Sequence, residues 1–287
     1  MKRILTALVL ILVVFCLFFF GRLWMVSLAS ALVAELAAYE YLKLAAVGAE
    51  FHNARLRIPL WWMAPATALA FIVTLPGFPV EAQLPVVSAL TLILFAWNGF
   101  RAPLIQVLPD TAQGLFGLIY IAYPLTLIPM IWKQEDGLAL VFFLMACVWT
   151  GDIAALYIGR AFGKHKLAPR LSPGKTIEGS IASVIGSVLA GLGVIWLGDV
   201  LADRGNLVLH SVQPMWQSAI MAVLLNVAAQ VGDLLESAIK RGANVKDSGT
   251  MLPGHGGILD RIDALLVAAP VLWYMLLLKD YFGLGRF

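Results

Sequence analysis

The stretch from Lys240 to Asp263, KRGANVKDSGTMLPGHGGILDRID, concentrates side chains that could handle phosphate groups. Asp260 and Asp263 offer hard oxygen ligands of the kind that suit Mg²⁺, which commonly binds one or two carboxylates together with substrate phosphates. Counter-charge for a polyphosphate comes from the cations of the same stretch, which are Lys240, Arg241, Lys246 and Arg261. Its glycines and proline predict a tight, irregular loop. We therefore predict phosphoryl-group chemistry, although these residues alone leave the nucleotide and the acceptor open.

A second polar group precedes this loop, at the end of an apolar segment that reads QVGDLLESAIKR. Its polar members fall at positions i, i+3, i+4 and i+7, which places them on one face of a helix. They are Asp233, Glu236, Ser237 and Lys240. A solvated stripe at a helix end would be an alternative, but it does not explain why Leu234, Leu235 and Ile239 stay apolar beside two acids. We favour a stripe that faces the protein interior.

A third group begins with Asp152, which lies deep in an apolar segment. An ionised carboxylate there costs about 2.5–3.5 kcal/mol on membrane-insertion scales, so such a residue usually faces a partner or a polar cavity. Snorkelling near a helix end is the alternative for Asp152. The cations that follow, Lys164, His165, Lys166 and Arg170, could serve a substrate or only meet anionic lipid headgroups.

The sequence SPGKTIEG, Ser172–Gly179, offers hydroxyl and ammonium donors just before a predicted helix start. Free N–H groups at helix N-termini bind phosphate well, and Gly174 would let the backbone approach a ligand closely. Ser172, Lys175 and Thr176 are therefore candidate phosphate ligands. An ordinary capped helix start, with Glu178 in its first turn, is the alternative. The pattern is not that of the phosphate-binding loop of nucleoside triphosphatases, because position 170 is Arg.

The elements that must position these groups are membrane helices. The chain is 61% hydrophobic and only 13% charged, against about 25% charged in soluble domains. Apolar runs near the length of a bilayer span recur, and in lipid a helix satisfies its own backbone hydrogen bonds. Cys16 and Cys147 lie inside such runs and suggest neither a disulfide framework nor a metal site. We predict an all-α polytopic membrane protein with nine spans, Ile4–Phe20, Trp24–Ala46, Ile58–Thr74, Leu84–Phe100, Gln113–Trp132, Leu138–Gly159, Ile177–Leu197, Met215–Ile239 and Ile262–Leu278.

The distribution of Lys and Arg predicts the orientation of these spans. With a cytoplasmic N-terminus, most Lys and Arg residues outside the spans fall on the cytoplasmic side, as the positive-inside rule requires. The loops 160–176 and 240–261 would then share the cytoplasmic face. We read the first apolar run as a retained span and not as a signal peptide, because it is long for the latter. Residues 1–135 would form N-terminal and middle helices, and residues 136–287 a catalytic region.

The polar motifs together resemble the signature of the phosphatidate cytidylyltransferases, also called CDP-diacylglycerol synthases. In Ser237–Asp263 the similarity covers S-x-x-K-R, K-D, P-x-H-G-G and D-R-x-D. Upstream, the chain matches the family's Q-x-G-D-x-x-E-S at Gln230–Ser237 and its S-P-G-K-T-x-E-G at Ser172–Gly179. Asp152 matches an aspartate of the preceding helix. The resemblance is strong over residues 149–263, and before them it rests on the multiple spans alone.

The resemblance implies that CTP and phosphatidic acid react to give CDP-diacylglycerol and pyrophosphate. It implies an enzyme of the bacterial inner membrane that needs Mg²⁺, with a second, monovalent cation such as K⁺ left open, and a homodimer. Asp233 and Asp260 match the metal ligands. The small net charge of +3 gives no reason to expect nucleic acid as a partner.

The expected roles divide the candidate residues into two groups. The catalytic group contains Asp233, Lys240, Arg241, Lys246, Asp247, Asp260, Arg261 and Asp263. The substrate-binding group contains Asp152, Ser172, Lys175, Thr176, Glu178, Glu236, Ser237 and His255. No strong general base is needed, because the attacking group is already a phosphate oxyanion. Cations and a metal would offset the repulsion between the two anions.

Two other functions compete with this interpretation. A transporter could use intramembrane acids such as Asp152, Asp233 and Glu236. However, the charge gathers on one face and not at the midplane of an inverted repeat. A CTP-dependent lipid-alcohol kinase would use similar groups, but it would release CDP and a phospholipid.

Overall fold

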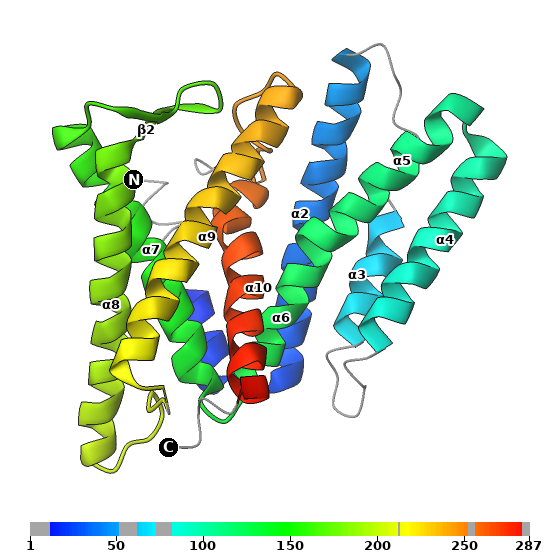
Figure 1. The fold of residues 1–287 in the computed structure, drawn as a ribbon. Helices are drawn as coiled ribbons and strands as arrows, with labels where there is room; N and C mark the ends of the chain where they lie inside the picture. The colour runs from blue at the N-terminus through cyan, green and yellow to red at the C-terminus, as the bar shows by residue number, and fades with distance from the viewer. Residues whose placement is uncertain (1–11, 52–61, 73–81, 212, 252–255, 283–287) are drawn as a thin grey trace. The chain divides into compact units, whose positions relative to one another are not determined.

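The computed structural model describes residues 12–51, 62–72, 82–211, 213–251 and 256–282, and these are mostly helical (Figure 1). Residues 12–20 are helical and precede the first labelled helix. The following helices are α2 Leu23–Phe51, α3 Met63–Ile72, α4 Gln83–Arg101, α5 Leu104–Gly117, the π-helix η3 Leu118–Ala122, α6 Tyr123–Trp132 and α7 Gly137–Phe162. Two strands, β1 Lys166–Ala168 and β2 Ser172–Thr176, lead into α8 Ile177–Asp203, α9 Met215–Gly242 and α10 Leu259–Phe282.

The helices confirm the predicted class of polytopic membrane protein. Among the described residues, seven segments are long and apolar enough to cross a membrane. They are Leu23–Gly48, Leu84–Arg101, Leu104–Trp132, Gly137–Phe162, Ile177–Asp203, Met215–Gly242 and Leu259–Lys279. Of the nine predicted spans, the first, Ile4–Phe20, is described from residue 12 onward, and that part is helical. Ile58–Thr74 is represented by α3, which is ten residues long.

The chain forms two compact units. Unit 1 contains Met1–Pro129 and Ile239–Ile262, and unit 2 contains Met130–Ala238 and Asp263–Phe287. Each unit therefore joins an early or middle part of the chain to a short C-terminal segment. The loop before α10 and the first turn of α10, with Asp260, belong to unit 1, whereas the helix start after SPGKT belongs to unit 2.

In unit 1, α2 packs against α5 and η3, which form one continuous rod with the start of α6. The Tyr41 hydroxyl of α2 donates a hydrogen bond of 3.0 Å to the carbonyl oxygen of Gln113 in α5. Gly117 allows this close approach, since a Cβ there would lie 2.9 Å from the Tyr41 ring. On the other side of α5, the Asn98 amide of α4 donates to the Thr111 hydroxyl at 3.1 Å. These buried polar contacts fix α2 and α4 against the rod.

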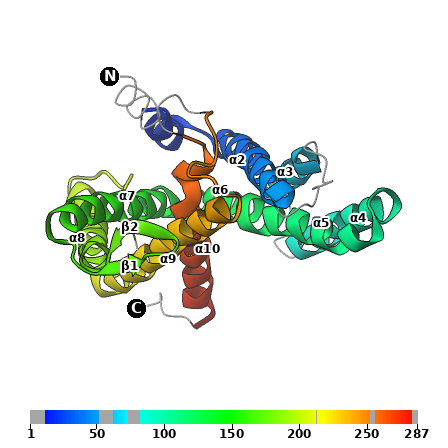
Figure 2. The same ribbon diagram turned by 90° about the horizontal axis from the view of Figure 1, so that it is seen from above.

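In unit 2, α7 and α8 lie side by side over much of their length (Figures 1 and 2). Small residues recur every fourth position along the buried face of α8, at Gly179, Ser183, Ser187 and Gly191. Such spacing lets the backbones of two membrane helices approach closely, and the gain is van der Waals packing that lipid cannot match. Gly151 of α7 has no side chain, and the Ser187 hydroxyl and the Asn226 amide occupy the space where its Cβ would lie.

A short β-hairpin connects α7 to α8, where the sequence analysis expected only a loop. β1 and β2 pair antiparallel, with Lys166 opposite Thr176 and Ala168 opposite Ser172. The predicted helix start after SPGKT is confirmed: Thr176 is the N-cap of α8, and its hydroxyl accepts a hydrogen bond of 3.2 Å from the Gly179 N–H. This cap satisfies one of the backbone donors left free at a helix N-terminus.

The packing of α7 on α8 predicts the effect of a larger side chain at Gly186. A Cβ there would lie 2.8 Å from the Ala154 Cβ and 3.3 Å from the Thr150 carbonyl oxygen, and neither atom can rotate away. Gly186→Leu should therefore destabilise the folded protein by about 1–3 kcal/mol. The matched control is Gly193→Leu on the same helix, because nothing lies within 4 Å of a Cβ at that position. Thermal melting in detergent, followed by size-exclusion chromatography, measures both; equal melting temperatures would contradict the packing argument.

Candidate active site

A cavity of about 380 Å³ lies within unit 2 and is bounded by α7, α8, α9 and the hairpin. We call it the hairpin cavity. Its polar lining comes from Asp152, Lys175, Thr176, Ser180, Ser183, Gln230 and Asp233, with Arg160 at α7. Asp152 thus lines a cavity together with other polar side chains, and its role there stays a prediction. Acids from α7 and α9 therefore line one space together with the lysine of β2.

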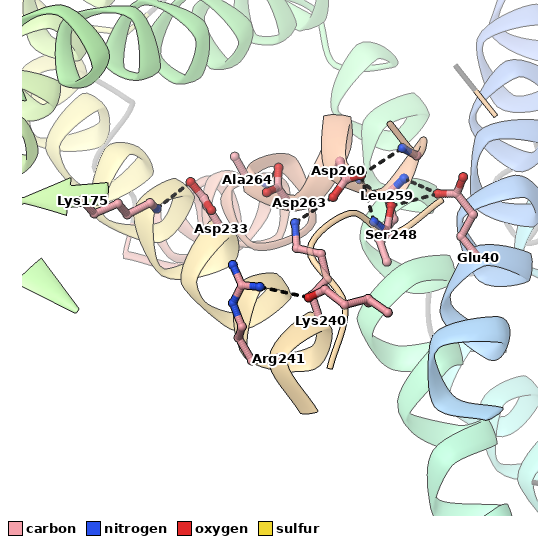
Figure 3. A network of polar contacts seen from close by, with 12 residues as sticks. Glu40, Lys175, Asp233, Lys240, Arg241, Ser248, Leu259, Asp260, Asp263 and Ala264 are labelled. Atoms are coloured by element: carbon pink, nitrogen blue, oxygen red, sulfur yellow. Dashed lines mark hydrogen bonds and ion pairs between the residues drawn. The ribbon is translucent and has the colours of Figure 1, made fainter. Parts of the chain in front are cut away.

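Lys175 pairs with Asp233 in this cavity, at 2.5 Å between Nζ and Oδ2 (Figure 3). The two side chains remain 24% and 36% exposed. An ion pair with this much exposure contributes little to stability, because both charges keep part of their hydration. Lys175 could therefore exchange the carboxylate for a phosphate at small cost. The sequence predicted both residues as site residues, but their pairing across some 58 positions of chain follows only from the fold.

Glu178 fastens the hairpin to the first turn of α8. Its carboxylate accepts hydrogen bonds from the backbone N–H groups of Lys164, at 3.1 Å, and His165, at 3.2 Å. The His165 Nδ1 atom lies 2.6 Å from the same carboxylate. In this structure Glu178 thus holds the loop that presents Lys175, and a direct substrate contact by Glu178 stays a prediction. Ser172 begins β2 and lies outside the residues that line the cavity.

A chain of side-chain hydrogen bonds, part of which lines the cavity, links α8 and α9. The Ser180 hydroxyl donates to Gln230 at 2.5 Å, and the Gln230 amide donates to Asn226 at 2.6 Å. The Asn226 amide in turn donates to Ser187 at 2.6 Å and to Ser183 at 2.9 Å. Within an apolar span such groups are costly unless paired, so the network fixes the positions of α8 and α9. The sequence analysis missed it, although Gln230 and Asn226 at i, i+4 were the available signal.

A second polar cluster, the Asp260 network, lies within unit 1 (Figure 3). Lys240 Nζ lies 2.7 Å from Asp260 Oδ1, and the backbone N–H groups of Ser248 and Gly257 donate to Oδ2 at 3.0 and 2.9 Å. The side chains of Lys240 and Asp260 are only 13% and 9% exposed. A buried ion pair is stable when further hydrogen bonds satisfy it, as they do here. Asp260 is consequently held in one orientation.

The remaining candidates differ in how they are placed. Glu236 and Ser237 are buried, at 0% and 8% exposure, which confirms that the polar stripe of α9 faces inward. Arg241 is exposed, and its guanidinium donates to the Val245 carbonyl oxygen at 3.1 Å. The Asp263 carboxylate accepts from the Ala264 N–H of its own helix at 2.8 Å. Lys246, Asp247 and Arg261 are exposed. His255 lies outside the described residues, and the roles of all these residues stay predictions.

The sequence analysis also missed Glu40, a buried acid on α2 that contacts the loop of the Asp260 network. The available signal was the presence of glutamates, Glu35 and Glu40, within an apolar span. In the part of the chain that the structure describes, no three His, Cys, Asp or Glu side chains come close enough to form a metal site by themselves.

The seven apolar helices found among the described residues, with carboxylates and cations gathered in a cavity and a buried network, define an integral membrane protein suited to binding phosphate groups. A model of the cytidylyltransferase family matches residues 1–279, and the chain belongs to this family. A relative from Brucella suis biovar 1 (strain 1330), named phosphatidate cytidylyltransferase, is 42% identical over 162 residues, which are 56% of this chain and 55% of the relative. Relatives with the same name occur in Bacillus subtilis (strain 168), 39% identical over 50% of each chain, and in Synechocystis sp. (strain ATCC 27184 / PCC 6803 / Kazusa), 30% identical over 96% of each. The chain thus spans about half the length of the first two.

The anchoring of the hairpin predicts the effect of losing the Glu178 carboxylate. Glu178→Ala removes the acceptor for the N–H groups of Lys164 and His165, so the amides of residues 164–176 should exchange hydrogen several-fold faster. Hydrogen–deuterium exchange in nanodiscs measures this change. Glu135→Ala, which removes an exposed acid from the turn between α6 and α7, is the control and should leave the segment unchanged. Unchanged protection in Glu178→Ala would show that the hairpin holds without this anchor.

Proposed function

We propose that this protein transfers the cytidylyl group of CTP to phosphatidic acid, giving CDP-diacylglycerol and pyrophosphate. The observation that carries the proposal is the hairpin cavity, where Asp152, Asp233 and Lys175 meet beside apolar helix surface. Membership of the cytidylyltransferase family supports CTP as the nucleotide. The relatives named phosphatidate cytidylyltransferase support phosphatidic acid as the acceptor.

The proposed reaction is the attack of a phosphatidate oxygen on the α-phosphorus of CTP. One P–O bond forms to the lipid phosphate, and the bond between the α-phosphorus and the bridging oxygen of the β-phosphate breaks. The electron pair leaves with pyrophosphate, so no residue has to remove a proton from the nucleophile. The barrier is the approach of two anions, which fixed cations lower. In the cavity Lys175 supplies such a cation. The sequence predicts the same role for the cations of the loop 240–261, which are Lys240, Arg241, Lys246 and Arg261.

The surface around the cavity suits a substrate with acyl chains. Leu156 lines the cavity and is 46% exposed, and on the same helix Ile153 and Tyr157 are exposed as well. Exposed apolar side chains on a membrane helix can face lipid without a free-energy penalty, because the lipid tails are apolar too. Phosphatidic acid could therefore place its phosphate beside Lys175 while its tails stay in the bilayer. This arrangement supports lateral entry of the lipid from the inner leaflet.

We propose Mg²⁺ as the cofactor, with Asp233 and Asp260 as its protein ligands. Their chemistry fits this ion, because Mg²⁺ prefers carboxylate oxygen and takes further ligands from phosphates and water. The structure places each carboxylate within its own unit, in the hairpin cavity and in the Asp260 network. That both hold one ion therefore rests on the sequence resemblance. When bound, Mg²⁺ would neutralise phosphate charge in the transition state. A second, monovalent cation such as K⁺ belongs to the same proposal.

The topology and assembly are proposed on the same basis. The apolar runs support nine spans, and the distribution of Lys and Arg supports a cytoplasmic N-terminus and a cytoplasmic active site. The family resemblance supports a bacterial inner membrane. Within this scheme residues 1–135 and 136–287 keep their expected roles as N-terminal helices and catalytic region. A homodimer is supported by the family resemblance, and light scattering of the purified protein measures it.

Product identification tests the proposed activity. Purified protein with radiolabelled CTP, phosphatidic acid and Mg²⁺ should give labelled CDP-diacylglycerol and unlabelled pyrophosphate in equal amounts when the label is at the α-phosphate. Chromatography of the lipid and aqueous phases identifies both. Release of CDP together with a phosphorylated lipid alcohol would instead establish a CTP-dependent kinase. Movement of a substrate into sealed vesicles without consumption of CTP would establish a transporter.

Substitution of the two proposed ligands tests their role. Asp233→Asn and Asp260→Asn keep the size of each side chain but remove its charge, so each should reduce turnover to below about a tenth of the wild-type rate. The folded, membrane-embedded protein should remain, as judged by size-exclusion chromatography. Asp203→Asn, at an exposed end of α8, is the matched control and should keep full activity. Turnover above a tenth in either variant would refute the assignment of that ligand.

A further inference from the structure

Glu40 is a buried carboxylate, 2% exposed, in the second predicted span and far in sequence from the signature motifs. Its Oε2 atom accepts two hydrogen bonds from the loop that leads into α10. One comes from the Ser248 hydroxyl at 3.2 Å, and the other from the Leu259 backbone N–H at 2.9 Å (Figure 3). All three residues belong to unit 1. A buried acid is costly unless its partners satisfy it, so this contact is a specific feature of the fold.

The backbone of the loop passes directly over the Glu40 carboxylate. A Cβ at Gly249 or at Gly257 would collide with the carboxylate, and at Gly257 it would also collide with the Ser248 hydroxyl. Gly256 has a φ of +80°, a left-handed conformation that favours glycine. These glycines were predicted to form a tight loop. The structure gives the reason for the tight loop: only a backbone without side chains can lie this close to Glu40.

Ser248 connects Glu40 to the Asp260 network. Its hydroxyl bonds to Glu40 and accepts from the Asp260 N–H at 3.3 Å, while its own N–H donates to Asp260 Oδ2 at 3.0 Å. The second partner of Glu40, the Leu259 N–H, belongs to the first residue of α10, immediately before Asp260. An acid is favourable at this position, since the N–H groups of the first helical turn lack partners within the helix. Glu40 thus accepts hydrogen bonds from Ser248, which itself binds the Asp260 carboxylate, and from the backbone N–H of the residue just before Asp260.

We propose that Glu40 is a positioning residue for the reaction: through Ser248 and the N-terminus of α10 it sets the orientation of Asp260 and the ion pair with Lys240. The proposal rests on the proposed function for its effect on turnover. It assigns a part in the active site to α2, which lies outside the region of strong resemblance. Lys240 binds Asp260 at 2.7 Å and would lose its place if the carboxylate turned.

Three variants separate hydrogen-bond geometry from charge. Glu40→Ala removes the acceptor, and Glu40→Asp withdraws it by one methylene group. Both should lower kcat about 10- to 100-fold, as is found when residues that support a metal ligand are replaced. Glu40→Gln should keep most of the wild-type kcat, because an amide oxygen can replace Oε2. The amide nitrogen would take the place of Oε1, which makes no hydrogen bond with any described residue. The KM for CTP should change less than kcat in all three.

Glu35→Gln is the matched control. It lies on the same helix and accepts a hydrogen bond of 2.6 Å from the Thr67 hydroxyl, away from the loop. If Glu40 only stabilised the fold, substitutions at Glu40 and at Glu35 would alter the melting temperature and leave the kcat of the folded enzyme unchanged. If it positions Asp260, Glu40→Ala should have no further effect on the residual rate in the Asp260→Asn background, because coupled residues are not additive.

Hydrogen exchange provides a readout that does not depend on catalysis. Glu40→Ala and Glu40→Asp should speed the exchange of the Ser248, Gly257 and Leu259 amides, whereas Glu40→Gln and Glu35→Gln should not. Faster exchange in a protein whose wild type makes no CDP-diacylglycerol would support the positioning and refute the proposed function. Wild-type turnover in Glu40→Ala, or unchanged exchange at the three amides, would overturn the positioning role itself.

Discussion

The hydrocarbon interior of a bilayer offers no water, so a charged side chain within a span must find its partner in the protein. This constraint accounts for the partners of three acids described above. Asp233 pairs with Lys175, Asp260 pairs with Lys240, and Glu40 receives two hydrogen bonds at the start of α10. These acids lie in apolar helices at positions where such partners exist. As a result, charge gathers in a few small clusters, and those clusters are the places where phosphate chemistry is feasible.

The two clusters differ in a way that suits different tasks. The Lys175–Asp233 pair is partly exposed and lines a cavity, so a ligand can displace one partner from the other. The Asp260 network is nearly closed, and three donors hold its carboxylate. Removing one partner from such a buried pair is expensive. The first arrangement permits exchange with substrate, whereas the second preserves a fixed geometry.

Close packing of helices supports the cavity. Without a hydrophobic effect between membrane helices, α7 and α8 associate through small residues and buried hydrogen bonds. The Ser180–Gln230–Asn226 chain then joins α9 to α8 at the wall of the cavity. The hairpin that carries Lys175 is fastened by Glu178 at the start of α8. The position of the cationic group therefore depends on contacts made by polar residues that need not touch the substrate.

The sequence by itself determined the class of protein, most of the spans, the helix start after Thr176, and the residues that gather charge. These features are local: hydropathy over a span, the i, i+3, i+4 spacing of α9 and the cap of α8 all depend on neighbours in the chain. Only the tertiary structure decided which charge meets which. The Glu40 carboxylate meets Ser248 across 208 positions of chain, and periodicity reports which face of a helix is polar but not what lies opposite it. The Asn226 network escaped prediction for the same reason, because Ser187 and Ser183 lie 39 and 43 positions away in the sequence. The β-hairpin is local, and it was missed because SPGKT lacks the alternating apolar pattern of a strand.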